Sequence, residues 1–184
     1  MTPRVLVAGV GNIFCTDDGF GSEAARRLAT ETLPPGVRVV DYGIRGMHLA
    51  YDLLDGYDAL VVLDAAPRGG QPGDIVVLEV GPDDLGTGAL DAHGMAPTDV
   101  LASLGSLGGS LPRTFVVGCE PADVGEGMGL TPTVAAAAER AVGVVTNLLE
   151  ELEPSISTRP AAALAASSTT MEAGSTYPER EHRP

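Results

Sequence analysis

Residues 4–21 read RVLVAGVGNIFCTDDGFG, and this stretch decides the fold. Its first seven residues form a short, valine-rich apolar run, which is typical of a strand buried on both faces of a sheet. Glycines and two aspartates follow, and a helical pattern begins near Gly21. A buried strand that turns through such residues into a helix is typical of the first unit of an α/β fold.

The same kind of apolar run returns three times, with helical patterns between the runs. The further strands that we expect to be buried on both faces lie at residues 37–42, 59–64 and 114–119. The shorter helices that we expect lie at residues 21–33, 47–54 and 96–107. Because parallel strands need such crossovers, the alternation predicts a mostly parallel sheet with helices on both faces.

A fifth apolar run, at residues 75–80, lies between the turn signals Pro72-Gly73 and Gly81-Pro82. The link over residues 65–74 is too short for a helical crossover. This strand is therefore predicted to be antiparallel to its neighbours and to lie at an edge. The fold class that follows is a three-layer α/β/α domain around a five-stranded, mixed, mostly parallel, twisted sheet.

The longest helix is predicted to begin at Thr131-Pro132, where threonine is a good N-cap and proline suits the first helical position, and to end at Pro154. Its apolar residues share one face: Val134, Ala138, Ala141, Val145, Leu148, Leu149 and Leu152. Beyond it the composition shifts to Ala, Ser, Thr and Pro. We therefore expect one domain over residues 1–154 and a disordered tail over residues 155–184.

Charge and cysteine content restrict the partners and the compartment. The formal net charge is −14, and all 11 basic residues are arginine, so nucleic-acid binding through clustered basic side chains is not expected. The two cysteines, Cys15 and Cys119, have no C-x-x-C or zinc-finger spacing. No apolar stretch has the length of a membrane span, and none resembles a secretion signal. We expect a soluble, unprocessed, cytoplasmic protein.

Candidate functional residues lie at the expected carboxyl ends of the strands, where open α/β sheets bind their ligands. Asp17 and Asp18 follow the first strand, and Asp64 ends the third strand along the chain. A buried, unpaired carboxylate is costly, so Asp64 is expected to meet either a cation or hydrogen-bond donors from loop amides. For Asp17 we expect a structural role as a cap of the helix that follows.

His93 is the one histidine expected in a loop at this edge of the sheet. His48 is expected on the surface of a short helix, and His182 lies in the expected tail. Asp18, Asp64 and His93 together would make an incomplete site for a borderline divalent metal such as nickel or zinc, with positions left for substrate or water. Their wide spacing in the sequence makes this pattern less specific than a local metal motif.

Other chemistries have less support in the sequence. A dinucleotide-binding fingerprint would have glycine where Phe14 stands, although Asp41 offers an acidic residue at the end of the second strand. A Walker P-loop requires a lysine, and a hydrolase serine requires a G-x-S-x-G elbow; the chain contains neither. Cys15 as a thiol nucleophile facing His93 stays open, but a small buried role is commoner for a lone cysteine.

Several motifs, in the same order along the chain, resemble the nickel-iron hydrogenase maturation endopeptidases. They comprise a Gly-x-Gly-Asn turn with an acidic pair, a glycine-rich turn after the second strand, a central strand that ends in an aspartate, a histidine followed by an Asp-Val-Leu segment, and two segments at the end of the last strand and the start of the longest helix. In this chain they lie at residues 9–21, 43–47, 62–65, 93, 99–101, 117–121 and 129–134. The resemblance covers roughly residues 4–152.

This resemblance implies a five-stranded mixed sheet of the phosphorylase/hydrolase-like type and a nickel-binding catalytic site made of Asp18, Asp64 and His93. The family often has glutamate where Asp18 stands, and Asp17 is the alternative ligand. In the family, nickel already loaded into a hydrogenase large-subunit precursor is the recognition signal, and the enzyme removes a C-terminal extension. The implied function is therefore an aspartic-type endopeptidase whose nickel is brought by its substrate.

Two alternatives from other classes remain at this stage. One is a non-proteolytic nickel-sensing or precursor-binding module, which would use the same metal-gripping residues. The other is a nucleotide-binding domain, which we rank last. In the favoured case we expect a monomer whose protein partner is the hydrogenase large-subunit precursor, without binding to nucleic acid or membrane.

Overall fold

The computed structural model describes residues 2–81, 84 and 97–157. Within them, strands and helices alternate as the sequence predicts. The strands are β1 (Val5–Val10), β2 (Val37–Gly43), β3 (Ala59–Ala65), β4 (Ile75–Val80) and β5 (Arg113–Cys119). The helices are the 3-10 helix η1 (Thr16–Gly19), α1 (Phe20–Leu28), α2 (Gly46–Leu53), α3 (Pro97–Ser106) and α4 (Pro132–Ser157).

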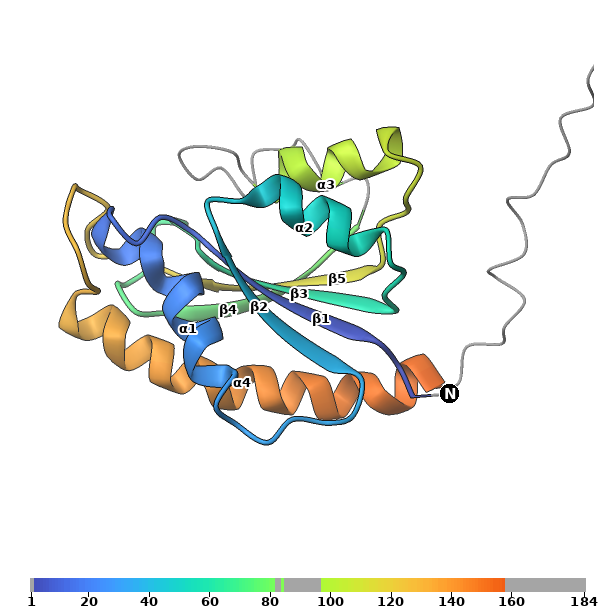
Figure 1. The fold of residues 1–184 in the computed structure, drawn as a ribbon. Coiled ribbons are helices and arrows are strands. Elements are labelled where there is room, and N and C mark those ends of the chain that lie inside the picture. Colours follow the sequence, from blue (N-terminus) through green and yellow to red (C-terminus); the bar gives the residue numbers. More distant parts are fainter. Residues whose placement is uncertain (1, 82–83, 85–96, 158–184) are drawn as a thin grey trace, which may run out of the picture.

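The five strands form one sheet in the order β2-β1-β3-β5-β4. The pairs β1–β2, β1–β3 and β3–β5 are parallel, whereas β4 pairs with β5 in antiparallel register. Both the mixed five-stranded sheet and the antiparallel edge strand are therefore confirmed. Figure 1 shows α1 and α4 on one face of the sheet and α2 and α3 on the other, which makes three layers.

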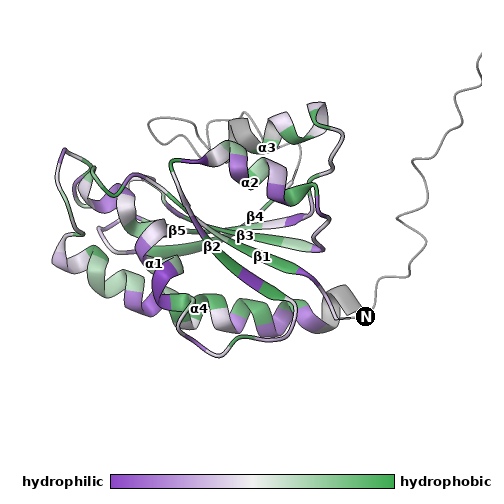
Figure 2. Cartoon of the chain, viewed as in Figure 1, coloured by the Kyte–Doolittle hydropathy of each residue, from purple (hydrophilic) through white to green (hydrophobic). Residues whose placement is uncertain are grey.

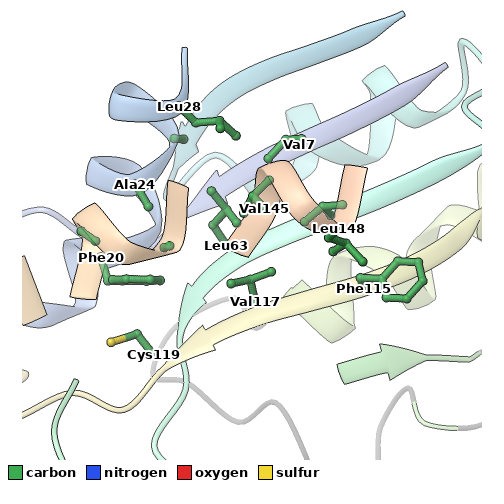
Figure 3. Packing of buried hydrophobic residues seen from close by; sticks show 14 of the residues in the cluster. Val7, Phe20, Ala24, Leu28, Leu63, Phe115, Val117, Cys119, Val145 and Leu148 are labelled. Carbon is green, nitrogen blue, oxygen red and sulfur yellow. The ribbon is translucent and has the colours of Figure 1, made fainter. Parts of the chain in front are cut away.

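The core has two halves because successive side chains of a strand point to opposite faces of the sheet. Val5 and Val7 of β1 pack on the α1–α4 face, together with residues such as Phe20 and Val145 (Figure 3). Leu6 and the other alternate residues of β1 pack on the α2–α3 face. Figure 2 shows hydrophobic colours along the central strands, which agrees with burial on both faces.

β2 departs from the predicted burial on both faces. Most of its residues are only half-buried, and Arg38 is exposed. The reason is its position: β2 is an outer strand of the sheet, with β1 as its only neighbour in the strand order. The valine-rich pattern of residues 37–42 predicts a strand correctly but does not reveal that the strand lies at an edge.

Two helix ends also differ from the predicted boundaries. α1 ends at Leu28 rather than at residue 33, because the Thr30 hydroxyl and main-chain N–H both donate to the Arg27 carbonyl and close the last turn. α4 continues past Pro154 to Ser157. A proline removes the hydrogen bond of its own N–H, and near a helix end the remaining bonds still allow one more turn.

Residues 155–157, which the prediction assigned to the tail, belong to α4. The rest of the predicted tail, residues 158–184, lies outside the described residues. In the part of the chain that the structure describes, no helix combines the length and the apolar character needed to cross a membrane.

Candidate active site

The candidate site lies where the strand order reverses. In the sheet, β1 has β2 on one side and β3 on the other, so the connections that leave β1 and β3 run in opposite directions. Such a point leaves a crevice at the carboxyl ends of the two strands, where α/β proteins bind ligands. Asp18 in η1 follows β1, and Asp64 is the last residue but one of β3.

Two glycines bring the acidic turn onto the sheet. A side chain on Gly11, whose φ is +127°, would overlap the main-chain oxygen of Asp18. A side chain on Gly21 would overlap the carbonyl oxygens of Val10 and Leu63, at the ends of β1 and β3. The glycines of this motif are therefore needed for close contact between η1, the start of α1 and the two central strands, which fixes Asp18 beside Asp64.

Asp18 is half-buried and is oriented from one side. Its Oδ2 accepts a hydrogen bond of 2.7 Å from the main-chain N–H of Asn12. Within the described residues its other carboxylate oxygen makes no hydrogen bond, so it can still take a ligand. The Asn12 side chain in turn holds the turn together, because its Oδ1 accepts from the Phe14 N–H at 3.0 Å.

Asp64 is buried, with an exposed fraction of 5%. Burial is the main cause that raises the pKa of this carboxyl well above its ordinary value, and the negative charge of Asp18 raises it further. A main-chain hydrogen bond with Ala65 acts in the opposite direction. Asp64 is therefore a carboxylate that the fold buries next to another carboxylate, with little compensation from the protein.

A divalent cation is the ligand that this pair fits. Two neighbouring carboxylates repel each other when both are ionised, and a cation bound between them would remove both the repulsion and the cost of burial. Carboxylate oxygens suit hard and borderline divalent metals. Among the described residues, no group of three or more His, Cys, Asp or Glu side chains is arranged to hold a metal.

His93, the third residue predicted for the site, lies outside the described residues. The structure thus brings Asp18 and Asp64 together, and the position of His93 relative to them stays a prediction. His48 is exposed on α2, as expected.

Asp17 has a different role from its neighbour. It is fully buried, and its carboxylate accepts hydrogen bonds from the N–H groups of Ala122, Asp123 and Thr131 and from the Thr131 hydroxyl, at 2.7–3.0 Å. Its structural role was predicted, but the partners were not. Instead of capping α1, it anchors the loop between β5 and α4, so its oxygens are already used and it is a poor alternative to Asp18 as a ligand.

The loop between β5 and α4 is the part of the site region that sequence reasoning missed. Its backbone lies along the turn after β1: Thr16 N–H bonds to the Gly127 carbonyl at 3.0 Å, and the Thr16 hydroxyl bonds to the Gly125 carbonyl at 2.8 Å. These bonds hold Thr16 at a φ of +48°, which is unusual for a β-branched residue. The sequence signal was Asp17 itself, since a buried carboxylate needs donors from somewhere in the chain.

Asp41 and the two cysteines each make a hydrogen bond within the protein. Asp41 is bonded to the Arg26 guanidinium and to the Gly43 N–H, so its carboxylate is occupied within the protein. Cys15 is half-buried, and its sulfur accepts from the Asn12 side-chain amide at 3.3 Å. Burial raises the pKa of the Cys119 thiol to about 12, which keeps this thiol protonated and unreactive.

Comparisons with known proteins identify relatives of this chain. The model of the HycI hydrogenase maturation protease family matches residues 23–148. Among curated relatives, HupD of Rhodobacter capsulatus is 35% identical over 136 residues, which cover 72% of this chain and 64% of HupD. The hydrogenase 2 maturation protease of Escherichia coli K12 is 34% identical over 154 residues, which cover 80% of this chain and 92% of that protein.

Solved structures lead to the same family. The hydrogenase maturating endopeptidase HybD from E. coli superposes with a TM-score of 0.70 at 34% identity, covering 80% of this chain and 93% of that chain. HybD from Thermococcus kodakarensis gives a TM-score of 0.64 at 27% identity, covering 79% and 99%. The family model spans more than half of the sequence, and the fold is shared along nearly the whole length of these structures. The chain therefore belongs to the hydrogenase maturation protease family, a family of peptidases.

Proposed function

We propose that this chain removes the C-terminal extension from the precursor of a nickel-iron hydrogenase large subunit after the precursor has received its nickel. The observation that carries the proposal is the buried Asp64 beside Asp18 at the switch point of the sheet. A pair of neighbouring carboxylates that the fold compensates only in part is suited to bind a cation that arrives with the substrate.

In this proposal the nickel belongs to the precursor, and Asp18, Asp64 and His93 are the residues that hold it. Asp18 offers the carboxylate oxygen that is not bonded to Asn12, and Asp64 offers a carboxylate that gains from charge neutralisation. Bound nickel would supply a Lewis acid beside the peptide. The contribution of the protein is to fix the scissile bond next to these residues, which raises the rate through proximity and orientation.

The proposal makes the enzyme an aspartic-type endopeptidase that selects its substrate by the metal. An unloaded precursor lacks the cation, so it gains nothing from the two carboxylates and should not be cut. Release of the C-terminal peptide separates the enzyme from a non-proteolytic nickel-sensing module, which would bind the loaded precursor through the same residues and release no peptide.

Intact-mass analysis of a co-expressed precursor tests the proposal. Wild-type protein should remove one C-terminal peptide from the nickel-loaded precursor and none from the unloaded one. Asp64→Ala and His93→Ala should each abolish the cleavage. Asp55→Ala is the matched control, because Asp55 is an exposed aspartate in the turn before β3, at the opposite end of the sheet.

The two possible failures have different meanings. If both Asp64→Ala and His93→Ala cut the precursor like wild type, the site assignment is wrong although the activity stands. If the wild-type protein binds a correctly loaded cognate precursor and releases no peptide, the proteolytic function is wrong and the binding module is the better account.

A further inference from the structure

A cavity of about 290 Å³ lies between α1, η1 and the start of α4. Its volume is close to the lower end of the roughly 300–1,000 Å³ that ligand pockets usually have. Glu23, Arg26 and Arg27 of α1 line one wall at helical spacing. The opposite wall is formed by Ala135 of α4 and by residues 128–130, which precede this helix. The cavity is separate from the pair of aspartates described above.

The cavity is next to the candidate site along the chain. Gly19, which directly follows Asp18, lines it, and so does Ile13. Ile13 in turn follows Asn12, whose N–H donates to the Asp18 carboxylate at 2.7 Å. Because Gly19 directly follows Asp18, a substrate whose scissile bond lies at Asp18 would have residues near that bond beside the cavity.

Apart from Thr16, the side chains that line the rest of the cavity are apolar. Ile13, Leu130 and Ala135 contribute aliphatic surface, and Met128 contributes a thioether side chain that is 78% exposed. Methionine adapts its shape easily and is used at binding surfaces for that reason. Apolar surface left in water inside a concave pocket favours burial of an apolar group from a ligand.

The α1 wall is polar, and its two arginines differ in how much they are engaged. Arg27 is held by Glu23 at 2.9 Å and by the Ala135 carbonyl at 3.3 Å, so it shapes the wall. Arg26 uses two of its nitrogens on a single oxygen of Asp41, at 3.0 Å each, and its side chain is half-exposed. A guanidinium has five N–H groups, so Arg26 keeps donors for a main-chain carbonyl of a bound peptide.

We propose that this cavity is the subsite that holds an apolar side chain of the precursor, located near the scissile bond, while Arg26 donates to the main chain of the same segment. The inference rests on the proposed function and deepens it. The two aspartates select for the metal, and the cavity selects for the sequence of the segment next to it.

A pair of substitutions on neighbouring residues of α4 tests the cavity. Ala135→Phe fills it, whereas Ala136→Phe places the same side chain on an exposed position that does not line it. With the nickel-loaded cognate precursor, Ala135→Phe should lower kcat/KM by about tenfold to a hundredfold, mainly through KM, which is the range for loss of one buried apolar side chain. Ala136→Phe should cut the precursor like wild type.

Changes in the precursor complete the test. Replacing the apolar residues on either side of the scissile bond one at a time with glycine should identify one position that weakens cleavage by wild type. At that position, glycine should restore cleavage by Ala135→Phe relative to the unchanged precursor, because the filled cavity no longer has to accept a side chain. A general distortion of the site by Ala135→Phe would give no such recovery and would overturn the proposal.

A second pair keeps the proposal testable if Ala135→Phe does not fold. Met128→Asp places a charge on the wall of the cavity, and Val124→Asp places one on an exposed residue of the same loop that does not line it. Met128→Asp should raise KM strongly and Val124→Asp should not. Equal kcat/KM values for the two variants would overturn the subsite, while cleavage by wild type would leave the proposed function standing.

Discussion

The ionised form of Asp64 destabilises the folded chain, because this carboxylate is buried beside the charge of Asp18. Replacing it with asparagine keeps its shape and removes the charge. We expect Asp64→Asn to raise the free energy of unfolding at pH 7 by roughly 1–3 kcal/mol, the usual cost of a poorly compensated buried polar group, while processing of the precursor is lost. Urea denaturation without added metal, together with the cleavage assay, measures both effects.

The difference in stability between Asp64→Asn and wild type should depend on pH in a definite direction. The pKa of Asp64 is raised on folding, so the folded chain binds the proton more tightly than the unfolded chain. The stability that Asp64 contributes is therefore present at pH values below its ordinary pKa of 3.8 and is lost as the pH rises through the higher folded value. The advantage of Asp64→Asn over wild type should grow over that window. An Asn variant less stable than wild type at pH 7 would contradict this account.

Asp17 and Asp18 are neighbours in sequence with opposite expected effects. Asp17→Ala removes the acceptor of three main-chain N–H groups and of the Thr131 hydroxyl, so we expect it to lower the free energy of unfolding by about 3–5 kcal/mol. Asp18→Ala removes one hydrogen bond and relieves repulsion on Asp64, so its stability should stay within about 1 kcal/mol of wild type while cleavage is lost. Thermal and urea unfolding of both variants separate the anchor from the proposed ligand; similar stability losses would contradict the assignment.

At the level of elements, Gly21 and Gly143 make a matched pair, since both lie in α-helices. Helix propensity alone predicts that alanine stabilises either position by about 0.5–1 kcal/mol. At Gly143 a Cβ meets nothing within 4 Å, so we expect that gain. At Gly21 a Cβ would overlap the ends of β1 and β3, so α1 must shift away from the sheet. We expect Gly21→Ala to cost several kcal/mol and to abolish cleavage, measured by urea unfolding and the processing assay.

The strands and helices could be predicted from the sequence more completely than their positions in the sheet, their ends and their long-range contacts. β1, β3 and β5 were evident from the sequence because burial on both faces leaves a continuous apolar run, which few other structures produce. The edge position of β2 and the extension of α4 past Pro154 depend on neighbours and on end effects that a local pattern does not contain. The carboxyl-end position of Asp18 and Asp64 followed from topology, whereas the partners of Asp17 lie more than 100 residues away in the chain.

At the level of the whole molecule, α4 joins the last part of the described chain to the core. Leu148, Leu149 and Leu152 are buried on the α1–α4 face of the sheet, in the second half of the helix. Each such side chain is worth about 2–5 kcal/mol when it is removed from a core. Their sum is comparable with the 5–15 kcal/mol by which a typical domain is stable. The domain should therefore need α4 as far as Leu152.

Two truncations of the chain should therefore give opposite results. A chain that ends at residue 157 should unfold at the same urea midpoint as the full chain and should cut the precursor normally, because residues 158–184 are rich in Ala, Ser, Thr and Pro and poor in large apolar residues. A chain that ends at residue 147 should fail to fold cooperatively. Circular dichroism and urea titration of the two chains test the pair. If the chain that ends at residue 157 lost cleavage and kept its stability, only a functional contact would have been removed. The tail would then have a role in binding the precursor.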